Sequence, residues 1–212
     1  MRIGYLNPRY AGFMHALDSH YFRACRPAIG PLFHRPTGID FYAPLGTSHH
    51  GNGSGLRSVK LWDVPKSESE GFVPIGEGCK FGGVYLDRLT PVPSNKPLFS
   101  PWEEVLAREL SDEDYLENQY RRYILEQQEA WLEEHAEHLA EKAEAFYELM
   151  KDKAAVRYLS KKGVCTPHLT RLEKVCWDFN PDKLAKENKL KYKNAPRTKK
   201  VFGASITRTL SY

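Results

Sequence analysis

The chain has 212 residues, a formal net charge of +4 and 41% hydrophobic residues, which is enough for one domain of ordinary size. It contains no run of about 18 apolar residues, so its sequence offers no transmembrane helix. Four cysteines are too few for a disulfide-rich secreted scaffold.

Charge and turn-forming residues are unevenly distributed along the chain. Residues 1–99 hold most of the glycine and proline, residues 100–163 are strongly acidic, and residues 164–212 are strongly basic. Between Trp102 and Lys162 there is neither glycine nor proline. The expected fold is therefore mainly α-helical with a large irregular content. A long central helix, or a helical hairpin, would be flanked by an extended Gly/Pro/aromatic-rich N-terminal segment and by a basic C-terminal tail.

The N-terminal segment, residues 1–99, is interrupted throughout by turn-forming dipeptides that oppose long regular elements. A short helix near residues 12–25 and short strands at 38–42, 58–63 and 83–86 are compatible with the pattern. Two interpretations stay open. We favour an extended docking segment that aromatic side chains anchor to a partner, and the alternative is a small self-contained β-rich fold.

The middle segment, residues 100–163, reads as a long acidic helix. Ser100, Pro101 and Glu103 form a strong helix start, and a second start lies near Asp112. Without a breaker, the helical pattern then continues to Gly163, a natural C-terminal stop after two lysines.

An apolar stripe follows this helix at the 4-3-4-3-4 spacing of a coiled-coil seam. Its members are Leu132, Ala136, Leu139, Ala143, Phe146 and Met150. Because so long a helix exceeds the width of a small domain, we expect the stripe to dock on a helix of another subunit. The alternative is a break near Gln127, which would fold the helix back on itself.

The tail is an electrostatic footprint for an anionic partner. Its candidate contact residues are Lys183, Lys186, Lys189, Lys191, Lys193, Arg197, Lys199 and Lys200. An acidic protein surface, RNA or anionic lipid would each suit such a tail.

The sequence contains no motif that predicts catalysis. The glycine-rich run at residues 51–55 lacks the lysine and spacing of a phosphate-binding loop. Two sets of potential zinc ligands, the His49–His50 pair and the Cys165, His168 and Cys176 set, each lack a complete set of four. His135 and His138 lack the spacing of a zinc protease. We therefore expect no catalytic residue, no metal and no cofactor, and predict that the chain is not an enzyme.

Together these patterns favour a non-catalytic accessory subunit that stabilises a large multiprotein assembly through contacts with its other subunits. The first 35 residues are rich in arginine and poor in acids, which favours a peripheral subunit of a mitochondrial inner-membrane respiratory or ATP synthase complex. The alternatives are an axonemal doublet microtubule inner protein in the cytoplasm or cilium, a mitochondrial or other ribosomal RNA-binding protein, and a small enzyme.

Overall fold

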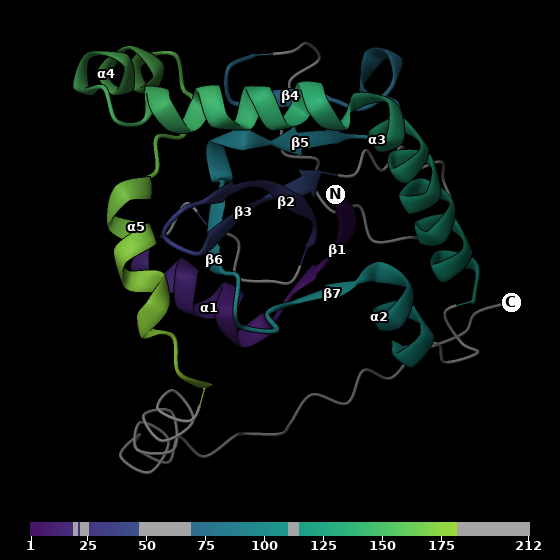
Figure 1. Ribbon diagram of the computed structural model, residues 1–212. Helices are drawn as coiled ribbons and strands as arrows, with labels where there is room; N and C mark the ends of the chain where they lie inside the picture. The colour runs from purple at the N-terminus through teal and green to yellow at the C-terminus, as the bar shows by residue number, and fades with distance from the viewer. Residues whose placement is uncertain (19–20, 22–25, 47–68, 110–114, 182–212) are drawn as a thin grey trace, which may run out of the picture. The chain divides into compact units, whose positions relative to one another are not determined.

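The computed structural model describes residues 1–18, 21, 26–46, 69–109 and 115–181 (Figure 1). Contacts divide the chain into two compact units, Met1–Phe179 and Asn180–Tyr212. The strands and helices described here belong to the first unit. The expected strand at 58–63 and the basic tail from Lys183 onward lie outside the described residues. The division into segments at residues 99 and 163 stays a prediction about how the chain is organised.

The described part of the N-terminal segment is built around a seven-stranded antiparallel sheet. Its strands are β1 (Arg2–Leu6), β2 (Pro27–Arg35), β3 (Ile39–Gly46), β4 (Phe72–Pro74), β5 (Gly83–Tyr85), β6 (Thr90–Pro93) and β7 (Phe99–Pro101). The expectation of a mainly helical chain with an irregular N-terminus is therefore wrong. Of the two interpretations of this segment, the β-rich alternative comes nearer to the structure.

The order of the strands is β4-β5-β3-β2-β1-β7, and β6 also pairs with β3. Strand β3 is central because it has different partners along its length. Its first half pairs with β6, from Ile39 opposite Pro93 to Tyr42 opposite Thr90. Its last two residues pair with β5 instead.

Helices complete the unit (Figure 1). They are α1 (Pro8–Leu17), α2 (Trp102–Glu109), α3 (Tyr115–Leu149), α4 (Lys153–Lys161) and α5 (Leu169–Val175). Helix α3 contacts β1 and β2, α2 contacts β1 and β7, and α5 contacts β6. The strands and helices thus enclose one apolar core, which includes Ile3, Ile29, Phe41 and Leu139, each at most 2% exposed.

The long central helix of the sequence analysis is two helices. Helix α3 ends at Leu149, and Asp152 caps a new helix by accepting a hydrogen bond from the Ala154 amide at 2.7 Å. Helix α4 then ends at the glycine that the sequence indicated. Gly163 has a φ of +79°, and the Val164 amide donates to the Leu159 carbonyl at 3.1 Å, which closes the last turn.

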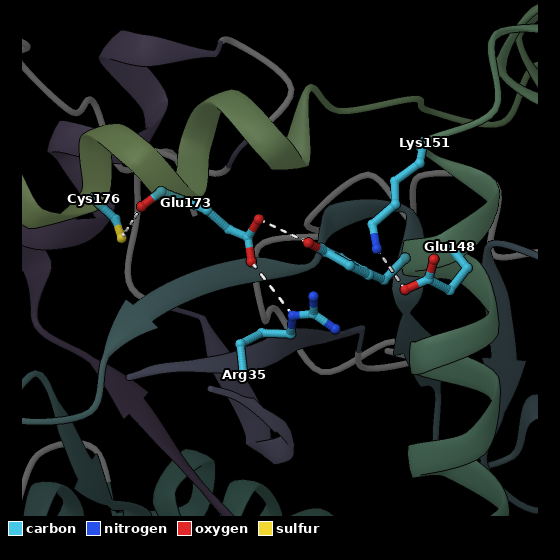
Figure 2. Close-up of polar contacts among 6 residues, drawn as sticks. Arg35, Glu148, Lys151, Glu173 and Cys176 are labelled. Carbon is cyan, nitrogen blue, oxygen red and sulfur yellow. Dashed lines mark hydrogen bonds and ion pairs between the residues drawn. The ribbon is translucent and has the colours of Figure 1, made fainter. Parts of the chain in front are cut away.

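Side chains from α3 and α5 meet over β2 (Figure 2). The Tyr147 hydroxyl donates to Glu173 Oε2 at 2.7 Å, and Arg35 Nε lies 4.0 Å from Glu173 Oε1. The Arg35 guanidinium and the Lys151 ammonium both lie over the Tyr147 ring, at 5.0 and 4.4 Å from its centre. Tyr147 is only 2% exposed. Because Tyr147 belongs to α3, Glu173 to α5 and Arg35 to β2, their contacts connect both helices to the sheet.

Candidate nucleic-acid interface

Basic and aromatic side chains gather where β3 ends. Extending the β2–β3 register beyond Ala28 and Pro44 places Arg26 opposite Gly46, the last residue of β3. Gly46 in turn pairs with Gly83 of β5, and β5 leads through Tyr85 into the short 3-10 helix Leu86–Arg88. Residues of three neighbouring strands thus meet at the end of β3.

The Tyr85 ring lies directly over Gly46. A methyl group built on Gly46 would meet the ring at 2.5 Å, closer than any ordinary contact, so the ring occupies the space that a side chain would need. Tyr85 also packs edge-on against Phe72, with ring centres 5.0 Å apart. Its ring therefore has a defined place on the sheet.

One guanidinium group lies over this tyrosine, and the charge of a second one acts on it. The Arg88 guanidinium lies over the Tyr85 ring, 5.9 Å from its centre. Arg26 is close enough to both for their charges to act on each other. Arg26, Tyr85 and Arg88 are all partly exposed, so each can contact a ligand.

Partial burial has electrostatic consequences for this group, which we call the β3-end cluster (Arg26, Tyr85 and Arg88). Desolvation raises the pKa of Tyr85, while the neighbouring positive charges of Arg88 and Arg26 act in the opposite direction. Desolvation also lowers the pKa of Arg26, and the positive charge of Arg88 adds to this effect. Arg88 also lies 3.8 Å from Asp87, measured from Nε to Oδ1. The positive charges of Arg26 and Arg88, which act on each other, favour the binding of an anion near both.

A second polar pair lies at the far end of β3 and has a structural explanation. His34 Nδ1 lies 2.8 Å from Asp40 Oδ1, and the two residues are register partners on β2 and β3. Because 58% of the His34 side chain is in solvent, this pair is a cross-strand contact of an exposed hairpin.

The apolar stripe expected to meet a partner helix lies within this chain's own unit. Leu132, Leu139, Ala143 and Phe146 are buried, and α3 contacts β1 and β2. Ala136 and Met150 are partly exposed. The sheet that covers this stripe was not foreseen. Docking of the stripe on another subunit stays a prediction.

The potential metal ligands are not brought together within the described residues, where no group of three or more His, Cys, Asp or Glu could hold an ion. Cys176 Sγ donates to the Glu173 carbonyl at 3.1 Å. His135 stacks on the Trp131 ring, with centres 4.3 Å apart. The His49–His50 pair lies outside the described residues.

Solved structures with a similar fold exist, although their sequences differ widely from this one. No protein-family model and no curated protein matches the chain. One similar solved structure concerns a bacterial antiviral system regulated by a processed non-coding RNA. Its chain is 16% identical with a TM-score of 0.56, and the match covers 85% of this chain and 99% of that one. Another concerns bacterial type III toxin–antitoxin systems, in which a non-coding RNA pseudoknot selectively inhibits a toxin. It is 18% identical with a TM-score of 0.55, and covers 84% of this chain and 98% of that one.

These likenesses are in fold, and they correct the functional expectations. Both neighbours come from bacterial systems that an RNA controls. The expected role as an accessory subunit of a respiratory or ATP synthase complex is therefore wrong, as is the mitochondrial location. The axonemal alternative is wrong for the same reason. The ribosomal alternative has only an RNA partner in common with these neighbours. None of the described helices is long and apolar enough to cross a membrane.

Proposed function

We propose that this chain is an RNA-binding toxin of a toxin–antitoxin type, and that its RNA site is the β3-end cluster. The observation that carries the proposal is the Arg88 guanidinium over the Tyr85 ring, together with the register position of Arg26 opposite Gly46, the residue that this ring covers. The fold supports it, because the similar structures come from systems in which a non-coding RNA acts as regulator or inhibitor.

The chemistry of the cluster matches single-stranded RNA. Guanidinium groups bind phosphate through paired N–H donors, and the part of the tyrosine ring that reaches solvent offers a surface on which a base stacks. The cluster combines both at the end of the central strand β3. Arg88 follows Tyr85 by three residues, and strand pairing fixes Gly46, under the ring, opposite Gly83.

We extend the proposal to cleavage of the bound RNA. RNA carries its own nucleophile, since the 2′-oxygen can attack the adjacent phosphorus while the bond to the 5′-oxygen breaks. The 2′-hydroxyl proton is lost and the leaving 5′-oxygen gains one, which leaves a cyclic phosphate and a 5′-hydroxyl. Arg26 and Arg88 would stabilise the extra negative charge on the phosphorus group in the transition state. A toxin that acts this way is blocked when an inhibitory RNA occupies the same cations. The sequence-based expectation of a non-enzyme stays the alternative.

One experiment tests binding and cleavage together. The purified chain is titrated into a fluorescent single-stranded RNA, and anisotropy is measured at several salt concentrations. Gels of the same samples report cleavage. We expect Arg26→Gln, Arg88→Gln and Tyr85→Ala each to weaken binding about tenfold, and each arginine variant to lower the salt slope by about 0.7. The exposed Arg171→Gln on α5 is the matched control.

The outcomes separate the two parts of the proposal. Wild-type chain that does not bind RNA, or cluster variants that bind as the wild type does, overturn the proposed site. Wild-type binding with intact RNA supports the non-enzyme alternative instead. If the wild type cleaves RNA and the Arg26→Gln and Arg88→Gln variants do not, the result supports an RNA-cleaving toxin.

A further inference from the structure

A second basic and aromatic surface lies on helix α4. Arg157, Tyr158, Lys161 and Lys162 are exposed, and their spacing of three and four residues puts them on neighbouring positions of one helical face. Tyr158 has 57% of its surface in solvent, and the Lys162 ammonium lies over its ring, 5.4 Å from the centre. We call these four residues the α4 face.

The charge of this face differs from that of the preceding helix. Helix α3 exposes acidic side chains, among them Glu133, Glu137 and Glu141, whereas the acid of the α4 region, Asp152, is used as the N-cap. The opposite face of α4 is apolar and turns inward at Leu159, which is 3% exposed. The basic face is therefore a local surface of positive charge presented to solvent.

The chain after α4 leads straight to the β3-end cluster. A methyl group built on Gly71 would lie 2.8 Å from a side-chain carbon of Val164, so Val164 packs directly against Gly71. The Cys165 amide donates to Asp87 Oδ2 at 3.3 Å. Asp87 is the neighbour of Arg88, and their side chains approach to 3.8 Å. The end of α4 and the cluster are thus in contact through this connection.

The connection has a fixed shape. Hydrogen bonds around Gly163 close the end of α4, and the hydroxyl groups of Ser160 and Thr166 lie 2.9 Å apart across the loop. Residues 162–165 span at most about 11 Å, and the steps to Asp87 and Arg88 bring the total to roughly 20 Å. That length corresponds to about six stacked nucleotides.

We propose that the α4 face is a second docking surface for the RNA strand that occupies the β3-end cluster. Lys161, Lys162 and Arg157 bind its phosphates, and a base stacks on Tyr158. The inference rests on the proposed function, since it needs an RNA in the cluster. An exposed aromatic ring beside three cations favours single-stranded RNA over an acidic protein surface, because it supplies a stacking platform as well as charge.

The two surfaces can be separated by the length of the RNA. A trinucleotide covers only one surface, whereas a strand of about twelve nucleotides can reach both. The test variant is Arg157→Gln/Lys161→Gln/Lys162→Gln, and Tyr158→Ala is measured alongside it. The control removes three other exposed charges, Arg9→Gln/Arg171→Gln/Lys174→Gln, so both triple variants have the same net charge. Circular dichroism and thermal unfolding check that each is folded.

We expect the α4 triple variant to lose about two units of salt slope with the long RNA, or about a hundredfold in affinity at 0.1 M salt if the curves meet at 1 M. Tyr158→Ala should weaken the long RNA about tenfold. Both variants should bind the trinucleotide as the wild type does, and the control triple variant should keep most of the affinity for the long RNA.

Other results overturn the inference. If the long RNA binds the α4 variants as tightly as the wild type, or if the control triple variant loses as much, the α4 face is no docking surface, although the proposed function survives. If the wild type binds neither RNA, the proposed function and this inference fail together. If an acidic peptide, and not RNA, loses affinity for the α4 variants, the partner is protein.

Discussion

Replacing Gly46 by alanine should move the Tyr85 ring and weaken RNA binding without unfolding the protein. The added methyl carbon would lie 2.5 Å from Cε2 of Tyr85 and 3.2 Å from its Cζ and hydroxyl oxygen. An ordinary contact between such atoms is about 3.5 Å or more, so the ring must retreat by about 1 Å. The clash is with the far end of a side chain, which can move.

The energetic consequence divides between stability and binding. Adding a methyl group to a packed position typically costs about 1–3 kcal/mol, and we expect the low end because Tyr85 is only partly buried. Loss of one stacked base costs about 1–3 kcal/mol of binding free energy. Gly46→Ala should therefore weaken RNA binding by about fivefold or more while the fold persists.

A double-mutant cycle isolates the cause. Gly46→Ala, Tyr85→Ala and the double variant are compared by RNA anisotropy and by thermal unfolding. If Gly46 acts by leaving room for the ring, the alanine at 46 has no further effect once Tyr85 is removed. Gly12→Ala is the control, since a methyl group there meets nothing within 4 Å in helix α1. Wild-type binding by Gly46→Ala, or losses that add fully in the double variant, would refute the argument.

Three further predictions concern stability. Phe146→Ala should destabilise the fold by about 3–5 kcal/mol in denaturant unfolding, because this side chain is 1% exposed, and a loss below about 1 kcal/mol would contradict its core position. Tyr147→Phe should cost about 1 kcal/mol by removing the hydroxyl that donates to Glu173, and Glu173→Gln measured beside it should show coupling. Burial, and then the charge of Asp87, raises the pKa of Cys165 to about 12. The unfolded thiol ionises near pH 8.5 and the folded one does not, so stability should fall as pH rises from about 9 to 12, and a Cys165→Ser variant should lose part of that dependence.

The sequence predicted individual strands but not the sheet. The expected strands at 38–42 and 83–86 overlap β3 and β5, and the helix expected near 12–25 overlaps α1. The prolines argue against a sheet in this segment, because proline lacks a backbone donor and opposes long strands. In the structure Pro91 and Pro93 lie in β6, which pairs with β3. Pro31 lies where the β2–β3 register shifts between Ile29 and Phe33, a position that does not need its missing donor.

The stripe on α3 shows a different limit. Its spacing correctly marks residues that avoid water, since Leu132, Leu139 and Phe146 are buried. Periodicity identifies a buried face but not the surface that buries it. Without a predicted sheet, another helix is the expected cover for the stripe. In the structure the sheet contacts α3, and the rings of Phe41 in β3 and Tyr147 in α3 lie 5.2 Å apart between their centres.

The candidate site could not be read from the sequence for a similar reason. Arg26, Gly46 and Tyr85 are separated by about twenty and forty residues, and only the pairing of β2, β3 and β5 joins them. None of them belongs to a sequence motif. The glycine pair was a usable signal, because Gly46 opposite Gly83 leaves a strand position without side chains, and aromatic rings occupy that space.

This arrangement implies that stability and RNA binding respond to different substitutions. The Tyr147 cluster joins α3 and α5 to one end of β2, whereas Tyr85 lies over the last residue of β3. Phe146 and Tyr147 should therefore change unfolding while leaving the affinity of the folded fraction intact. Substitutions of Gly46 and Arg88 should weaken RNA binding more than they weaken the fold. Because the β3–β5 pairing places Tyr85, a variant that weakened both properties in proportion would show that this pairing itself had opened, and hydrogen exchange at Leu45 and Val84 would locate that opening.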